Sequence, residues 1–147
     1  MDVEIELHER ILSQSREGVN FTSWLPAICY NLFMKISDVI KTLDGKLVAG
    51  GESDATVGAI VANDLMSDVL LCDADDVLLL TSLASDQAVR TANIVGAVAV
   101  VVHNAKPLPA TMCQVADTLG IPLISSPYSK YDSCVKLYLA QEAEKRG

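Results

Sequence analysis

The sequence predicts an α/β domain, a three-layer sandwich with a mostly parallel central sheet. One observation is the unbroken run of small and β-branched apolar residues from Ala97 to Val102, which is typical of a strand covered on both faces. A second is that short apolar runs alternate with stretches of helical spacing along most of the chain. The connections between them are short, as right-handed crossover units require.

Composition limits the class of protein and its partners. The 147 residues suffice for one domain, or one domain with an extension, and half of them are hydrophobic. The net charge of −8 argues against nucleic acid and against an anionic membrane surface. No apolar run approaches the ~20 residues that span a bilayer. The stretch from Met1 to Arg10 is acidic and lacks the order of a secretory signal, so we expect a cytoplasmic protein.

The cysteines and the acidic loop do not predict a metal site. Cys29, Cys72, Cys113 and Cys134 form no Cys-x-x-Cys pair and have no histidine at ligand spacing, so we interpret them as reduced, buried thiols. The aspartates at 73–76 lack the glycine and the distal glutamate of a calcium loop.

The first 33 residues differ from the rest. They contain both phenylalanines and the only tryptophan, and a new pattern begins at Met34. Two interpretations stay open for residues 1–33. They are a peripheral extension or a mis-called start, or they form a helix that docks through Trp24 and Phe33. In either case the α/β domain is predicted over residues 34–147.

Local signals predict the elements of the first half. Ser37 or Asp38 can cap a short helix that ends at Leu43. The following elements are a strand over 46–49, a strand over 57–62 and a short helix or turn over 65–71. Gly50 and Gly51 follow the first strand, but no Gly-Lys-Ser/Thr follows them, so they predict a turn and not a phosphate loop.

The second half continues the alternation. A strand over 77–80 is followed by a helix over 87–95, which Ser85 and Asp86 can cap. After the strand over 97–102 come a helix over 110–119, which ends at Gly120, a strand over 121–125 and a terminal helix to about Glu144. Pro122 cannot donate to a sheet, so it must occupy an unpaired position, such as the start of its strand.

Candidate site residues follow the predicted strands, because ligand sites of open α/β sheets form beyond the carboxyl ends of the strands. The polar residues at these exits include Asn63, Asp64, Ser85 and Ser125. From the wider group we select as ligand-binding candidates Thr81, Ser82, Asp86, His103, Asn104, Ser126 and Ser129. The helix N-termini after these exits offer free N–H groups suited to a small anion.

His103 is the strongest single candidate, because a histidine can bind or move a proton near neutral pH. The alternative is structural: His103 closes its strand and bonds to a neighbouring loop, and Asp86 caps a helix. A triad of Ser126, His103 and Asp86 is not expected, because polar residues at neighbouring exits allow such a drawing in almost any α/β domain. The sequence therefore predicts no catalytic residue.

From Met34 to about Tyr138 the chain resembles a DRTGG domain. The order of features carries the resemblance, above all the stretch from Ala116 to Ser129, with its helix, Gly-Ile-Pro, strand and Pro-Tyr-Ser. The motif that names the family is altered. Gln87 stands where its arginine would be, and His103-Asn104-Ala105 stands where Thr-Gly-Gly would be.

The resemblance implies a regulatory or dimerising module, related to the N-terminal domain of HPr serine kinase. Small stand-alone members occur in anaerobic bacteria, often beside iron hydrogenase subunits. We expect a non-catalytic module that senses a small anion or nucleotide, because the sequence contains no recognisable nucleophile–base pair, metal cluster or phosphate loop. We expect a homodimer, because the chain is small and rich in apolar residues. The resemblance implies a protein partner in a redox or hydrogenase system. The alternative is a phosphoryl-transfer enzyme or accessory related to HPr serine kinase, although the phosphate-binding loop is missing. No cofactor is assigned.

Overall fold

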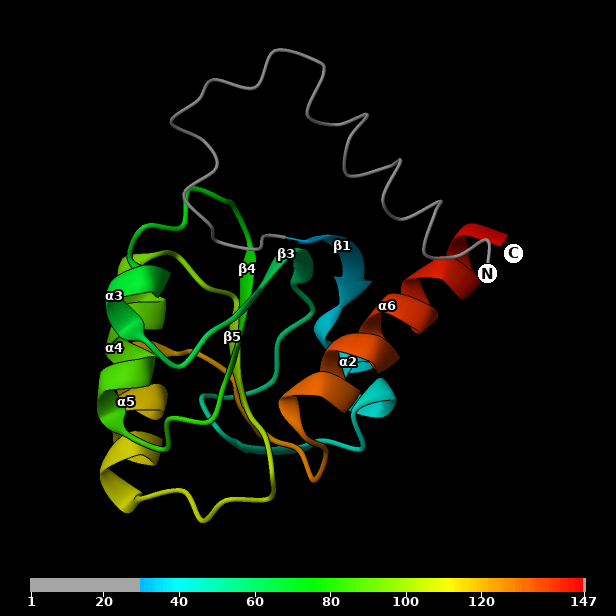
Figure 1. Ribbon diagram of the computed structural model, residues 1–147. Helices are drawn as coiled ribbons and strands as arrows, with labels where there is room; N and C mark the ends of the chain where they lie inside the picture. The colour runs from blue at the N-terminus through cyan, green and yellow to red at the C-terminus, as the bar shows by residue number, and fades with distance from the viewer. Residues whose placement is uncertain (1–29, 147) are drawn as a thin grey trace.

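Helices cover both faces of a six-stranded sheet in the computed structural model, which describes residues 30–146 (Figure 1). In chain order the elements are β1 (Tyr30–Lys35), α2 (Ile36–Thr42), β2 (Lys46–Ala49), β3 (Thr56–Ala62), α3 (Met66–Val69), β4 (Val77–Thr81), α4 (Asp86–Ile94), β5 (Ala99–Val102), α5 (Ala110–Leu119), β6 (Leu123–Ser125) and α6 (Lys130–Arg146). The predicted fold class, an α/β sandwich around a mostly parallel sheet, is confirmed.

The strands lie in the order β1-β3-β4-β5-β6-β2. The four strands from β3 to β6 are parallel, whereas β1 and β2 pair antiparallel to them at the two edges. Strand β5 lies between β4 and β6, and all of its side chains are buried. The apolar run at 97–102 therefore marks an interior strand, as its composition predicts, although the strand begins two residues later than expected.

The strands supply side chains to two separate cores, because successive side chains of a strand point to opposite faces. In β4, Val77 and Leu79 pack in the core beneath α3, α4 and α5. Leu78 and Leu80 pack in the core beneath α2 and α6. All four residues are fully buried. Figure 1 shows the two helical layers on either side of the sheet.

Some helix and strand ends follow from local chemistry. The Ser85 hydroxyl accepts a hydrogen bond from the Gln87 N–H at 3.1 Å and caps α4. Gly120 ends α5 in the left-handed conformation, with φ 66°. Pro122 precedes β6, where its carbonyl accepts from the Val100 N–H at 2.9 Å. The predicted cap of α2 is wrong, since the N-cap residue is Lys35 and no side chain caps the helix.

The first strand begins before the boundary expected at Met34. Tyr30 of β1 pairs with Ile60 of β3, so residues 30–33 belong to the sheet. Phe33 lies in this strand, where 72% of its surface is exposed, and not in a docking helix. Trp24 and the rest of residues 1–29 lie outside the described residues, and the division of the chain into extension and domain stays a prediction.

Candidate functional site

The carboxyl ends of four parallel strands meet at one edge of the sheet. Thr81 of β4 is paired with Val102 of β5, and Val102 is paired with Ser125 of β6. Beside them, the N–H of Asn63, directly after β3, donates to the Leu80 carbonyl at 3.0 Å. The polar residues that follow these strands therefore leave the sheet side by side.

Asp64 is the most connected polar side chain at this edge. Its Oδ1 accepts from the Thr81 hydroxyl at 3.1 Å and from the Ser82 N–H at 2.6 Å. Its Oδ2 accepts from Lys130 Nζ at 2.8 Å, an ion pair between residues 66 positions apart in the chain. One carboxylate thus joins the ends of β3 and β4 to the first turn of α6.

The surroundings of Asp64 favour its charged form. Partial burial alone would raise the pKa of this carboxyl. The hydrogen bonds from Lys130 and Ser82, together with the charge of Lys130, outweigh burial and hold the pKa well below its ordinary value of 3.8. Asp64 is therefore an anion at neutral pH and holds Lys130 in place.

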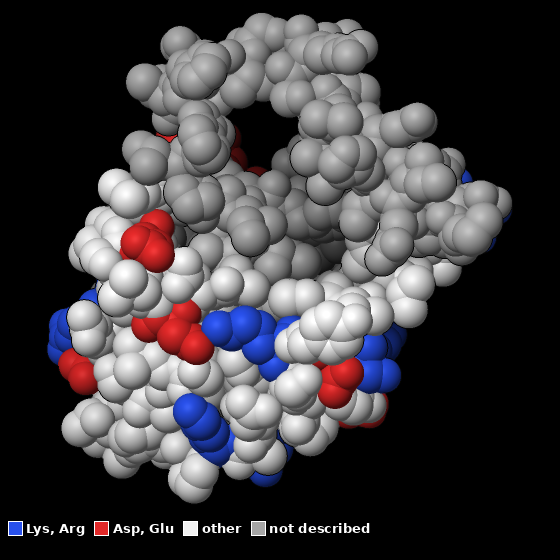
Figure 2. Space-filling view, viewed as in Figure 1, with Lys and Arg blue, Asp and Glu red and all other residues white. Residues whose placement is uncertain are grey.

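A second lysine reaches the same edge. Lys106, in the loop between β5 and α5, donates to the Ser82 carbonyl at 2.8 Å. A carbonyl is a neutral acceptor, so this bond positions the ammonium group without neutralising its charge. On the face seen in Figure 2, basic and acidic side chains of the described residues form small adjoining patches and no continuous basic surface.

His103 lies beneath this charged network and is only 1% exposed. Its N–H continues the sheet to the Thr81 carbonyl at 3.2 Å. In the ring, Nδ1 lies 3.4 Å from the amide nitrogen of Asn104, and Nε2 has no hydrogen-bond partner among the described residues. In the tautomer in which Nδ1 accepts from the Asn104 amide, the ring proton lies on Nε2 and the buried Nε2–H is an unused donor among the described residues.

Burial lowers the pKa of His103 below its ordinary value of 6.5, because the interior disfavours the charged ring. The positive charges of Lys130 and Lys106 lower it further, whereas Asp64 opposes them. The imidazole is therefore neutral at pH 7 and acts as a donor without carrying charge.

The loop after His103 adopts an unusual backbone conformation. Asn104 and Ala105 both have positive φ, 66° and 49°. Their N–H groups donate to the carbonyls of Tyr128 at 2.8 Å and Ser126 at 2.9 Å, which fastens this loop to the loop between β6 and α6. Glycine is the residue that adopts such a conformation without strain. The conformation is present here without glycine.

The serines after β6 have structural partners. The Ser126 hydroxyl is fully buried, donates to the Leu43 carbonyl at 2.8 Å and accepts from the Tyr128 N–H. The Ser129 hydroxyl accepts from the Asp132 N–H at 3.1 Å at the start of α6. The Tyr128 hydroxyl donates to Asp44. These contacts hold the loop between β6 and α6 in position beside the candidate site.

Asp86 has a different environment from the other candidates. Its carboxylate accepts from Arg90 Nε at 3.1 Å, one turn along α4, and both side chains are well exposed. The hydroxyl of Ser126 donates to the Leu43 carbonyl and Asp86 accepts from Arg90, and these bonds differ from those of a Ser126–His103–Asp86 triad.

The structure therefore brings together Thr81, Ser82, His103 and Asn104 of the selected candidates, and adds Asp64, Lys106 and Lys130. Asp64 was recognised as a strand-exit residue but not selected, and the two lysines were missed. Lys130 did carry a signal in the sequence. A lysine in the first turn of a helix opposes the helix dipole, which indicates that an anion compensates it.

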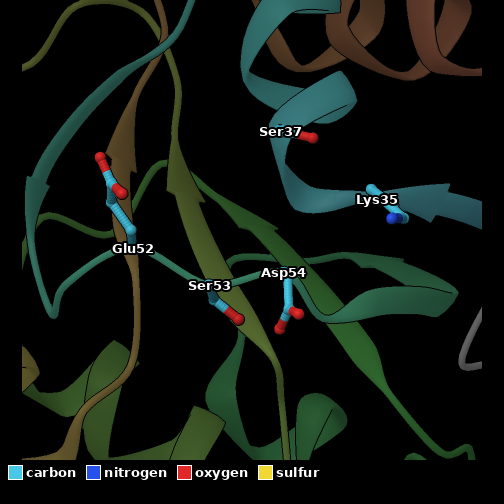
Figure 3. Close-up of a pocket in the computed structure, with 5 residues that line it drawn as sticks. All are labelled: Lys35, Ser37, Glu52, Ser53 and Asp54. Atoms are coloured by element: carbon cyan, nitrogen blue, oxygen red, sulfur yellow. The ribbon is translucent and has the colours of Figure 1, made fainter.

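A separate open pocket of about 530 Å³ is lined by Lys35, Ser37, Glu52, Ser53 and Asp54. It lies between the start of α2 and the connection from β2 to β3, and it contains none of the candidate residues. In Figure 3 the carboxylates of Glu52 and Asp54 point in different directions and do not converge on one position. This pocket does not have the convergent polar groups of a binding site.

Residues 30–146 also bear on metal binding and on membrane insertion. No group of three or more His, Cys, Asp or Glu side chains there could hold a metal ion. Nor does any helix in that part of the chain have the length and apolar character needed to cross a bilayer.

No family model and no curated protein matches the chain. Among solved structures, it is similar to the crystal structure of the CBS and DRTGG domains of the regulatory region of Clostridium perfringens pyrophosphatase, complexed with its activator diadenosine tetraphosphate. The TM-score is 0.59 and the sequence identity 10%; the match covers 71% of this chain and 46% of that chain. The chain thus corresponds to less than half of that regulatory region.

At this identity the likeness establishes the fold alone. The chain has a DRTGG-like α/β fold, as the order of its sequence features predicts. The likeness does not support the expected relation to HPr serine kinase.

Proposed function

We propose that the chain is a non-catalytic regulatory module that binds a phosphate-bearing anion, such as a nucleotide, at the carboxyl edge of its sheet. The observation that carries the proposal is the buried Nε2–H of His103, which has no partner among the described residues and has two lysines nearby. A buried donor without an acceptor is costly unless a bound group satisfies it.

The chemistry of the edge fits a phosphate oxygen as this acceptor. Lys106 carries a charge that a neutral carbonyl contacts, and Lys130 can bind a second anionic oxygen while it stays near Asp64. The neutral imidazole donates one hydrogen bond to the ligand. Asp64 repels anions that do not contact both lysines, which favours a polyphosphate over a small monovalent anion.

The similar regulatory region supports a nucleotide as the ligand to test first, because that protein is complexed with diadenosine tetraphosphate. It also supports a regulatory and not a catalytic role. A protein partner in a redox or hydrogenase system and a cytoplasmic location remain separate predictions. Co-purification with a hydrogenase subunit tests the first.

The test is thermal unfolding of the full chain with diadenosine tetraphosphate, ATP and inorganic phosphate. A ligand at 100 times its dissociation constant adds about 2.7 kcal/mol to the free energy of unfolding, which raises the melting temperature by several degrees. We expect Lys106→Met and His103→Gln to remove this shift. The matched control is Lys35→Met, which removes a lysine from the other pocket.

Three results would contradict the proposal. One is the absence of a shift with every compound, and another is an equal loss in the Lys35→Met control. The third is release of phosphate from ATP by the wild-type chain that His103→Gln abolishes, because this favours the phosphoryl-transfer alternative.

A further inference from the structure

Helix α6 carries a row of apolar side chains on its outer side. Tyr131, Val135 and Leu139 are 77%, 37% and 59% exposed, and Ala143 continues the row as an exposed residue. These four residues recur at intervals of four, so they form one ridge along the helix. We call this ridge the outer stripe.

The inner side of the same helix is more polar than expected. Ser133 and Gln141 are buried there, on either side of Leu137. The Ser133 hydroxyl has no hydrogen-bond partner among the described residues. A surface helix normally faces its apolar side chains inward and its polar ones to water. Helix α6 departs from this pattern, since two polar residues are buried beside Leu137 while an apolar row lies outside. This departure indicates that the outer stripe has a partner of its own.

We propose that the outer stripe is the dimer interface of the protein and that its occupant is α6 of a second copy. Ridges formed by residues four apart interdigitate when two helices cross at about −50°. In a two-fold dimer the same patch faces itself, so one ridge is sufficient for both sides. Antiparallel packing centred on Leu139 places Val135 of each copy opposite Ala143 of the other.

The charges beside the stripe fit this arrangement. Lys136, Ala140 and Glu144 form the adjacent row, with a cation before the small central residue and an anion after it. In the antiparallel packing centred on Leu139, Lys136 of each copy comes to within about 3 Å, along the helix axis, of Glu144 of the other copy, an offset that a lysine side chain spans. Within one helix the two residues are about 12 Å apart along the axis, too far to pair. In the single chain, Lys136 Nζ lies 4.3 Å from the centre of the Tyr128 ring.

The first experiment is sedimentation equilibrium of the full chain at micromolar concentration. We expect the wild type to be a dimer and Leu139→Glu to raise the dissociation constant at least about tenfold, as for a residue at the centre of an interface. The matched control is Ile94→Glu, because Ile94 is 72% exposed on α4, on the opposite face of the sheet. It should leave the dimer unchanged.

Reversing the charges of Lys136 and Glu144, singly and together, tests whether a second copy of the chain covers the outer stripe. We expect Lys136→Glu and Glu144→Lys each to weaken the dimer about fivefold, since each creates two like-charge contacts. The double variant should restore the dissociation constant to within about twofold. Restoration requires a second copy, because the two positions cannot meet within one helix.

Other outcomes would overturn the proposal. A monomeric wild type whose melting temperature falls in Leu139→Glu but not in Ile94→Glu indicates that another part of the same chain covers the stripe. A dimer that Ile94→Glu dissociates and Leu139→Glu does not places the interface on α4. Single charge reversals that weaken the dimer without restoration in the double variant exclude the antiparallel arrangement.

Discussion

Ala105 has a backbone conformation that favours glycine, with φ 49°, directly after Asn104 with φ 66°. Asparagine tolerates this left-handed region, whereas alanine is strained there by about 1 kcal/mol or more. The strain is maintained because the N–H groups of both residues bond to the loop after β6. The loop after β5 therefore keeps this backbone shape at an energetic cost.

Ala105→Gly should raise the free energy of unfolding by about 0.5 kcal/mol, because the relief of strain exceeds the entropy that glycine adds to the unfolded chain. Urea-induced unfolding measures the change. Gly96→Ala is the control, and it should lower the free energy of unfolding where Ala105→Gly raises it. Gly96 has φ +69° and open space around its Cβ position, so this variant should lose about 1 kcal/mol. A loss in Ala105→Gly would show that the loop is not strained.

His103 makes stability depend on pH in a defined window. Its pKa in the folded protein lies below the ordinary value of 6.5, so the unfolded chain binds more protons as the pH falls. Stability should be complete above about pH 7 and decrease as the pH falls through 6.5. His103→Gln should flatten the dependence between about pH 7 and pH 5.

The pH range in which His103 affects stability is separate from the range in which Asp64 does. The lowered pKa of Asp64 gives stability that is present above about pH 4 and is lost in more acidic solution. Unfolding curves from pH 8 to pH 5 therefore report mainly on His103. An unchanged slope in His103→Gln would show that its ring is not buried in the neutral form.

At the scale of elements, the turn after β2 shows how two neighbouring glycines can differ. Gly50 and Gly51 have φ values of 84° and 80°. A Cβ at Gly50 would lie 1.8 Å from the Ile121 carbonyl oxygen, whereas Gly51 has open space. The Gly50 N–H also donates to Asp117 Oδ1 at 2.7 Å. Gly50 therefore forms a packed junction between the turn after β2 and the end of α5, where the sequence predicted only a turn.

Gly50→Ala should lose at least about 3 kcal/mol of stability, because a backbone carbonyl cannot move aside as a flexible side chain can. Gly51→Ala is the matched control and should lose about 1 kcal/mol from its backbone conformation alone. Chemical denaturation of both variants gives the comparison. Equal losses would show that the contact at Gly50 relaxes without cost.

Elements with strong local signals could be predicted from the sequence. Helix α5 has the expected bounds, because its apolar spacing and Gly120 both act within a few residues. Strand β1 could not be located, since its residues lack an alternating pattern and its register with β3 is irregular. The start of α2 was misjudged because Ser37 and Asp38 are good capping residues that the chain does not use as caps.

At the scale of the whole molecule, the sheet order predicts where the structure opens last. All residues of β4 and β5 are buried and each strand is paired on both sides, whereas β1 and β2 lie at the edges. Amide hydrogen exchange should be slowest in β4 and β5 and faster in β2. Equal protection across these strands would show that the domain opens only as a single unit.

The sequence predicted where the candidate site lies, but it did not predict all of the residues and contacts that form the site. The rule that ligand sites lie beyond the strand ends identified Thr81, Ser82, His103 and Asn104 at one edge. The bond from Lys130 to Asp64 could not be predicted, because it joins residues 66 positions apart through the fold. The unpartnered Nε2 of His103 also depends on burial, which no local pattern specifies.

The placement of β2 has a consequence for biosynthesis. This strand is made well before its partner in the sheet, because that partner is β6, about 75 residues further along the chain. The Leu43 carbonyl and Asp44, just before β2, likewise bond to Ser126 and Tyr128. A nascent chain on the ribosome can therefore not close this edge of the sheet until residue 128 has emerged from the exit tunnel. Until then β2 presents an unpaired edge to chaperones and to neighbouring nascent chains.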